Sequence, residues 1–427
     1  MNNKESIPDS IESKGSSLAF YALLIFTGFL YLSPQAYYRF LGPLRIQKVC
    51  VSFAILAHIL YSYRNNKPII RLDKATKLCF AILALALISI PFSSWPGGSF
   101  ELLTGTYLKV IIVFLMLPVV LISTERLKTM FWVVIICSVI LALLGIKAYL
   151  DGAFIAANRI GGARGGMTAN PNDLALTLTL SIPFLLSFLK IYNRPLIKIV
   201  CISSLAILIS AIICTFSRGA FITLVTVYAI FCLKTYRKNA FKILLATIIL
   251  TILFFMIAPE GYTDRLASIF DFSLDPTGSA YARKHSILLT IAFIKKHPLV
   301  GNGFGMNILV MADQANYWST VHNVYLQVAS EIGIPAMVIY IVLLIGLIKK
   351  MRSIQFNLTD TLSQEIQTLA QSLEIALIAF AVAAFFHPVA YHFHFYYLAG
   401  FAMAIKRITL KINTQYSKPS VSQVIAQ

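Results

Sequence analysis

Apolar stretches recur along almost the whole chain and alternate with shorter polar stretches. Several approach the roughly 20 residues that cross the hydrocarbon core of a bilayer, and the shorter ones reach that length with flanking residues. This pattern predicts an all-α bundle of about twelve transmembrane helices, in a domain at residues 18–408 between polar tails at 1–17 and 409–427. The apolar segments lie near residues 18–33, 46–63, 78–92, 108–123, 130–149, 174–189, 197–216, 220–233, 241–258, 334–348, 373–387 and 393–408.

The composition supports a membrane protein. Hydrophobic residues make up 58% of the chain and charged residues 12%, and the mean hydropathy is +0.78, far from the values of soluble globular proteins. The six cysteines are scattered through or beside apolar segments without a CxxC pair, so we interpret them as small core residues. The first seventeen residues lack the basic region and cleavage site of a signal peptide, which favours a cytoplasmic tail.

Lysine and arginine are distributed unevenly over the connections between the apolar segments. The connections after the second, fourth, sixth, eighth and tenth segments, together with the two tails, hold most of the 36 basic residues. The positive-inside rule therefore predicts that this side and both termini of this multi-pass protein are cytoplasmic. Topology explains most of the net charge of +19, so we expect a lipid bilayer and no nucleic acid as partner.

The longest polar interruption, residues 259–333, falls on the opposite side, which the rule assigns to the periplasm. It is longer than a turn between helices needs to be, so we expect a functional element there. Residues 281–296 carry isoleucine and leucine at helical spacing with basic residues near both ends, which predicts an amphipathic helix over the membrane mouth. The glycines at 301–305 follow no strand, so they indicate a tight bend rather than a dinucleotide site.

Arginines on the periplasmic side are the charges that the rule does not explain. Arg218 stands alone in a very short connection, TFSRGAF, without an acidic residue nearby in sequence. A guanidinium near the hydrocarbon boundary costs a few kcal/mol unless it is paired or solvated. Arg218 therefore either snorkels to the headgroups or binds a phosphate with its two-pronged donor geometry. Arg159 and Arg164 flank a Gly-rich loop, and each by itself is interpreted as keeping that loop soluble.

Carboxylates on this side are few and form no DxD pair that would hold a divalent ion on a diphosphate. Several arginines without a metal cage favour a ligand neutralised by guanidinium groups, such as a lipid-linked diphosphate. His322 could exchange protons near neutral pH, although a lone histidine at an interface more often forms a structural hydrogen bond. Glu331 lies too far along one helix to orient His322, so it should hold a loop or an arginine. Other candidate histidines are His285, His297, His387, His392 and His394.

Four motifs together resemble the O-antigen ligase and polymerase superfamily of bacterial inner-membrane proteins. The similarity covers about residues 160–350, and the order and spacing of the motifs around the long loop carry it. It does not distinguish among members of the superfamily. The motifs are ANPND at 169–173, SRGA at 217–220, HPLVGNGFG at 297–305 after Arg283, and HNVYLQVASEIGIPA at 322–336.

The resemblance implies transfer of a glycan from undecaprenyl diphosphate to an acceptor hydroxyl at the periplasmic face, without a cofactor. By the same resemblance Arg218 and Arg283 match arginines that bind the diphosphate, and Arg164 is a looser match. His322 matches the catalytic base. The basic residues that follow Arg283 depart from the family pattern, which leaves open which of them touches phosphate. Supporting residues in the shared motifs are Asn172, Asn323 and Glu331.

The acceptor decides between members of the superfamily. A ligase uses the lipid A core, a polymerase uses another lipid-linked repeat, and a protein O-glycosylation ligase uses a protein. For each we expect a metal-independent, inverting transferase in which Arg218, Arg283 and His322 meet in one periplasmic cavity. A lipid-linked glycan transporter is the alternative from another class, but its two related halves are not visible here. A structural membrane scaffold explains the arginines least well.

Overall fold

The computed structural model describes residues 9–155, 159–163, 165–259, 261–269, 271, 278–315, 320–356 and 361–416. These residues form sixteen α-helices, with short 3-10 and π turns between some of them, and contain no β-strand. The prediction of an all-α fold is confirmed.

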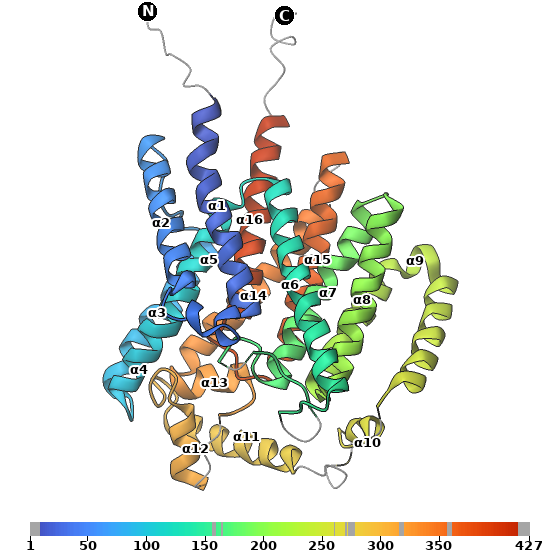
Figure 1. Ribbon diagram of the computed structural model, residues 1–427. Helices are drawn as coiled ribbons and strands as arrows, with labels where there is room; N and C mark the ends of the chain where they lie inside the picture. Colours follow the sequence, from blue (N-terminus) through green and yellow to red (C-terminus); the bar gives the residue numbers. More distant parts are fainter. Residues whose placement is uncertain are drawn as a thin grey trace, which may run out of the picture.

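The long helices stand side by side in a bundle (Figure 1). Within the described residues, eight helical stretches have the length and hydropathy of membrane spans, so the protein is a polytopic helical membrane protein. These stretches lie in or around α2, α3, α4 with α5, α6, α7, α8, α14 and α15. The bundle helices are α1 (Asp9–Leu32), α2 (Ile46–Arg64), α3 (Lys74–Ser89), α4 (Pro96–Leu102), α5 (Leu108–Val120), α6 (Thr124–Leu150), α7 (Pro171–Ile191), α8 (Pro195–Cys214), α9 (Arg218–Ile257), α14 (Ile334–Phe356), α15 (Thr361–Ala383) and α16 (Phe393–Tyr416).

Helix α9 folds back on itself. The hydroxyls of Tyr228 and Thr247 are 2.5 Å apart, and the rings of Phe221 and Phe254 are 5.7 Å apart. In a straight helix the first pair would be separated by about 28 Å, because each residue adds about 1.5 Å. The two arms of α9 therefore lie side by side (Figure 1), in agreement with the two apolar segments predicted at 220–233 and 241–258.

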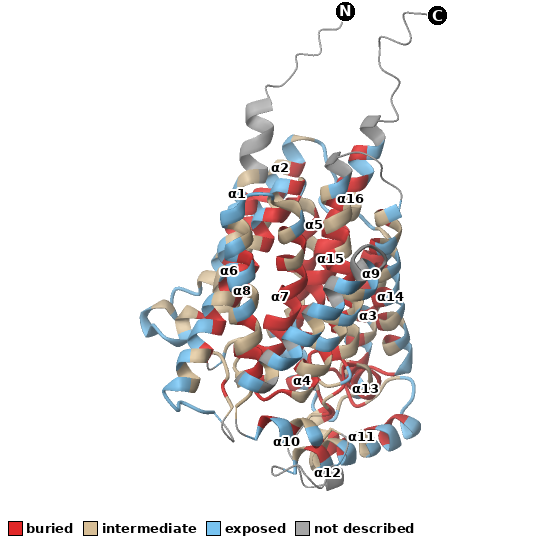
Figure 2. Ribbon diagram, turned by 90° about the vertical axis from the view of Figure 1, so that its right-hand side faces the viewer, coloured by how far each residue is buried: buried red, intermediate tan, exposed pale blue. Residues whose placement is uncertain are grey.

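Helix α7 runs through the centre of the bundle and is buried on nearly all sides (Figure 2). It contacts α6, α8, α9 and α15. Phe184 of α7 stacks on Phe131 of α6 with ring centroids 4.1 Å apart, and the hydroxyls of Ser181 and Ser138 pair at 2.8 Å. Close packing of this kind fixes both ends of α7, including the end that begins with the ANPND motif.

The long polar segment 259–333 folds at one end of the bundle. Its helices are α10 (Tyr262–Ala267), α11 (Ser279–Lys296), α12 (Asn307–Ala315) and α13 (Val324–Glu331). They lie at the bottom of Figure 1, opposite the end at which α1 starts and α16 finishes. The start of α1 and the end of α16 therefore share one end of the bundle and the long segment occupies the other, which is the arrangement that the alternating charge predicts.

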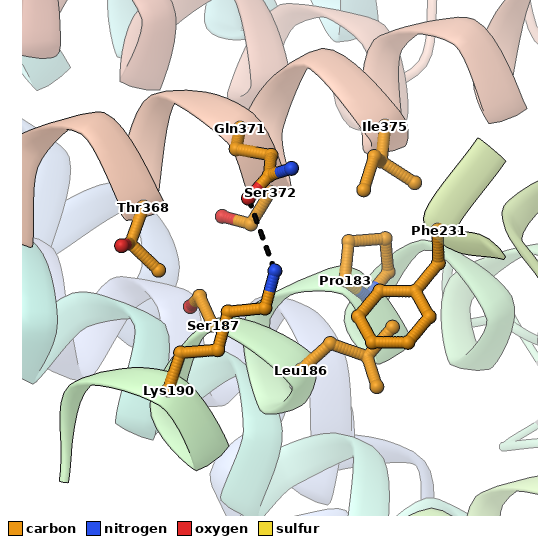
Figure 3. Close-up of a pocket in the computed structure, with 9 residues that line it drawn as sticks. All are labelled: Pro183, Leu186, Ser187, Lys190, Phe231, Thr368, Gln371, Ser372 and Ile375. Atoms are coloured by element: carbon orange, nitrogen blue, oxygen red, sulfur yellow. Dashed lines mark hydrogen bonds between the residues drawn. The ribbon is translucent and has the colours of Figure 1, made fainter. Parts of the chain in front are cut away.

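The end of the bundle at which α1 starts and α16 finishes carries buried ion pairs. Glu374 of α15 is fully buried and accepts hydrogen bonds from Lys234 and Arg352, each at 2.7 Å. A small pocket nearby, shown in Figure 3, has room for about 10 Å³, which is at most one water molecule. Lys190 crosses it to Gln371 at 3.2 Å (Figure 3). These contacts lock α7, α9, α14 and α15 together.

Candidate active site

The N-terminal end of α7 is fixed by the ANPND motif. The Asn170 side chain accepts a hydrogen bond from the N–H of Asn172 at 2.8 Å, and Pro171 takes the first helical position. Asn172 Oδ1 accepts two further hydrogen bonds, from Arg159 Nη2 at 2.7 Å and from Ser217 Oγ at 2.9 Å. Ser217 also caps α9. Asn172 thus ties the loop before α7 to the start of α9.

His322 immediately precedes α13, which its neighbour Asn323 caps. Asn323 Oδ1 accepts hydrogen bonds from the N–H groups of Tyr325 and Leu326, each at 3.0 Å. The N–H of Val324 donates to a carbonyl just after α15 at 2.7 Å. These bonds hold the start of α13 against α15, so the position of the His322 backbone is determined by two helices.

The glycine-rich bend after α11 packs on the C-terminal end of α13. The N–H of Asn302 donates to Ser330 O at 2.8 Å. Gly301 has φ +71°, and a Cβ there would lie 2.5 Å from Ser330 O, so this position requires glycine. Glu331 is fully buried and accepts the N–H of Asn307 at 3.3 Å. Glu331 therefore holds the bend, which is one of the two roles that its distance from His322 left open.

A cavity of about 530 Å³ lies where these elements meet. Its volume is in the range of small-molecule sites. It brings Arg159, Arg283 and His322 to one surface, although 163 positions of sequence separate the first from the last. The lining residues are Ile155, Arg159, Ala169, Asn170, Pro171, Asn172, Ser279, Ala282, Arg283, Ser286 and His322.

Helix α11 forms one wall of this cavity, as the predicted helix at 281–296 required. The isoleucine and leucine stripe of this helix is only partly buried. Leu288 is 56% exposed, whereas Ile294 is buried. The face turned to the cavity instead carries Ser279, Ala282 and Arg283. The small side chains let the helix come close, and they leave Arg283 as the charged group of this wall.

The environment of His322 favours its neutral form. Burial lowers the pKa of His322 to about 4, with Arg283, His387 and Arg159 acting in the same direction and Asp173 opposing them. At neutral pH the imidazole is therefore uncharged and can accept a proton. Its Nδ1 is buried and has no hydrogen-bond partner in the part of the chain that the structure describes.

Arg218 does not line the cavity itself but contacts its wall. Its Nη1 donates to Ser268 Oγ at 2.6 Å and its Nη2 to Ser279 Oγ at 2.9 Å. Ser279 begins α11 and lines the cavity. The guanidinium therefore joins the start of α9 to α11, next to the position where Arg283 enters the cavity.

Residues 203–341 match the sequence profile of the family described as O-Antigen ligase. Over these residues the chain is similar to the O-antigen ligase family. The matched region includes Arg218, Arg283 and His322, and it ends in α14. No curated protein matches the chain at significant similarity.

Arg159 supplies a second guanidinium to the cavity, beside that of Arg283. Interpreting Arg159 as a residue that keeps the loop soluble is wrong, because its side chain is half-buried, lines the cavity and bonds to Asn172 and to Thr215 O, the latter at 2.9 Å. Arg164, the looser match from the sequence, lies outside the described residues. The only sequence signal for Arg159 was its place beside the Gly-rich loop that leads into ANPND.

A second group of titratable residues lies close to this candidate site. His387 is 1% exposed, and its Nδ1 is 3.7 Å from Asp173 Oδ1. His394 Nε2 and Thr177 Oγ1 pair at 2.9 Å. The connection between α15 and α16 that carries His387 is thus largely buried, with Tyr391 6% exposed. Within the described residues, no group of three or more His, Cys, Asp and Glu side chains is placed to hold a metal ion.

Proposed function

We propose that this protein transfers a glycan from undecaprenyl diphosphate to the hydroxyl of an acceptor, the lipid A core, at the periplasmic face of the bacterial inner membrane. The observation that carries the proposal is the cavity in which Arg159 and Arg283 meet the neutral His322. Two guanidinium groups suit a diphosphate, and a neutral imidazole suits an acceptor hydroxyl. The similarity of residues 203–341 to the O-antigen ligase family supports a glycan-transferring enzyme.

In the proposed reaction the acceptor oxygen attacks the anomeric carbon as the bond from that carbon to the diphosphate oxygen breaks. The electron pair of the broken bond leaves with undecaprenyl diphosphate. Arg159 and Arg283 stabilise the charge that develops on the leaving group, and removing one such donor typically costs on the order of 3 kcal/mol in activation energy. Because guanidinium groups neutralise the diphosphate, the reaction needs no metal ion. Attack from the face opposite the diphosphate inverts the anomeric carbon.

The proton of the acceptor hydroxyl passes to a ring nitrogen of His322. The positive charge of Arg283 disfavours protonation of the His322 ring and contributes to its low pKa of about 4. A bound diphosphate brings negative charge into the same cavity and raises the pKa of His322, so the imidazolium forms only when donor is present. The negative charge of Asp173 also raises the pKa of His322 and so stabilises the protonated ring.

The substitution His322→Ala tests this role. We expect transfer to fall by about 100- to 10,000-fold, which is the usual contribution of a general base, while binding of the lipid diphosphate is retained. The measurement is transfer of glycan between purified donor and acceptor in proteoliposomes. His285→Ala is the matched control, because His285 is exposed on α11 and does not line the cavity. Transfer at the wild-type rate by His322→Ala would remove this histidine from the reaction.

The assignment of the cavity to the periplasm rests on the distribution of basic residues and has its own test. Lys284 of α11 and Lys349 of α14 are both exposed and lie at opposite ends of the bundle. In a variant without the native cysteines, we expect a membrane-impermeant thiol reagent added to intact spheroplasts to label Lys284→Cys and not Lys349→Cys. Labelling of both or of Lys349→Cys alone contradicts the proposed sidedness.

A further inference from the structure

A second cavity, of about 190 Å³, lies between the ends of α1 and α2 on the same side of the bundle as the candidate active site (Figure 1). It is separate from the first cavity, since the two share no lining residue. Nothing in the proposed reaction uses it. Its lining residues are Phe29, Gln35, Leu41, Gly42, Arg45, Ile46, Gln47 and Lys48.

Two cations of this cavity have no counter-charge among the residues that the structure describes. Neither the Arg45 nor the Lys48 side chain forms an ion pair or a hydrogen bond with any residue that the structure describes. Both belong to the end of the bundle that the positive-inside rule leaves poor in basic residues. Two neighbouring positive charges repel each other, so a site that holds both without a carboxylate is suited to a bound anion.

The remaining polar groups of the cavity complement an anion that also carries a hydroxyl. The side-chain oxygen of Gln35 is buried without a hydrogen-bond partner in the described chain, so it can accept from a ligand O–H. Arg45 precedes the first turn of α2 in a left-handed conformation, with φ 46° and ψ 39°, and makes no capping bond with its side chain. The Arg45 guanidinium therefore forms no hydrogen bond with the first turn of α2. Strain of this kind in a residue other than glycine costs about 1 kcal/mol and is concentrated at binding sites.

The loop that closes this cavity carries the side chains of a membrane interface. Tyr37, Tyr38 and Phe40 are 55%, 59% and 70% exposed. Exposed aromatic residues beside basic ones are typical of the headgroup level of a bilayer. An anion that reaches Arg45 and Lys48 at this level is most directly supplied by a lipid headgroup.

This loop also contacts the loop of the candidate active site. Ser33 starts the connection between α1 and α2, and a Cβ on Gly166 would lie 2.5 Å from Ser33 Oγ. Gly166 belongs to the connection that carries Arg159 into the first cavity. A lipid bound in the second cavity would therefore be separated from the first cavity by a single loop.

We propose that the cavity formed by Gln35, Arg45 and Lys48 binds the phosphate of a phosphorylated, hydroxyl-bearing membrane lipid and so positions the acceptor for transfer. The assignment of the lipid as acceptor rests on the function proposed above, whereas the binding of a lipid phosphate does not. The chemistry requires a phosphate monoester or similar anion on an amphiphile, with a hydroxyl close to it. A neutral lipid of the same chain length lacks the group that the two cations recognise.

The test is binding of phosphatidic acid, whose phosphate monoester supplies both the negative charge and, as its P–OH, the hydroxyl from which Gln35 can accept; binding to the full-length protein in detergent is measured by native mass spectrometry. Arg45→Gln/Lys48→Gln should weaken binding of one phosphatidic acid molecule about tenfold or more, because both charged donors are lost. The matched control is Arg39→Gln/Lys284→Gln, which removes the same charge from exposed positions at the same end and should bind as the wild type does. Diacylglycerol should not bind at this site in any variant.

Three outcomes overturn the proposal. They are unchanged binding of phosphatidic acid in the Arg45→Gln/Lys48→Gln variant, equal weakening in the control, and full displacement by an equal concentration of inorganic phosphate, which would indicate a site for free phosphate.

In the transfer assay, the cavity variant should raise the KM for the acceptor about tenfold without a matching rise in the KM for the donor. An unchanged acceptor KM would overturn the acceptor role. Arg283→Gln separates the two proposals, since it should abolish transfer and leave phosphatidic acid binding intact. If the wild type shows no transfer while the cavity variant loses lipid binding, the proposed function fails and the lipid site stands.

Discussion

Arg218 should act through its two-pronged contact with α10–α11 rather than through charge alone, and Arg218→Lys tests this. The guanidinium donates to Ser268 and Ser279 at 2.6 Å and 2.9 Å, from two different nitrogens. An ammonium has a single nitrogen on a flexible stem and can keep at most one of these bonds in the same geometry. A hydrogen bond from a charged group contributes about 1.5–3 kcal/mol. Arg218 is half-buried, so we take the lower value, which corresponds to roughly a tenfold loss of transfer.

The assay is the transfer rate in proteoliposomes at saturating donor and acceptor, with the melting temperature measured in parallel. Ser279→Ala removes one acceptor of the same pair and should lower the rate to a similar extent, and the double variant should be no worse than Arg218→Lys. Arg39→Lys is the control, because Arg39 is exposed in another loop at the same end. A wild-type rate for Arg218→Lys refutes the reasoning. A large effect of Arg218→Lys on the donor KM with none from Ser279→Ala would mean that Arg218 contacts the diphosphate itself.

Two further substitutions test the supports of the site. Burial raises the pKa of Glu331 to about 7, above its unfolded value of 4.5, so its contribution to stability is highest below pH 4.5 and falls as pH rises towards 7. Glu331→Gln should therefore gain stability relative to the wild type as the pH rises from 5 to 8, by at most about 3 kcal/mol. The same change of melting temperature with pH in both proteins would contradict the assignment. Gly219→Ala places a Cβ 2.8 Å from Phe386 Cβ, beside His387, and should lower both the melting temperature and the transfer rate. Gly346→Ala meets nothing within 4 Å and should do neither, so equal effects of the two substitutions would dismiss the steric argument.

The bundle could be predicted from the sequence because hydropathy and basic residues are local signals. The polar gap in α9 is an example, since the lysines and arginines near residues 234–242 marked a turn between two apolar arms. The contacts of Tyr228 with Thr247 support that turn. The end at which the long segment lies also followed from charge alternation alone.

The geometry of the cavity depended on contacts between distant residues, which no local pattern encodes. Arg159 points into the cavity because Asn172 and the Thr215 carbonyl hold its guanidinium. Arg218 meets Ser279 across 61 positions of sequence. The face that α11 turns to the cavity carries small residues rather than the apolar stripe, and the helical spacing in the sequence does not specify this rotation.

The buried Glu374 has a consequence for the order in which this protein is made. Its partner Lys234 precedes it by 140 positions, so the lysine emerges from the ribosome long before the carboxylate that will pair with it. At about 5–20 residues per second, the interval is roughly 7–28 s. During that interval Lys234 lacks the carboxylate of α15 with which it pairs. The ion pair between Lys234 and Glu374 can therefore form only after α15 has been made, and a chain that ends before residue 374 cannot form it.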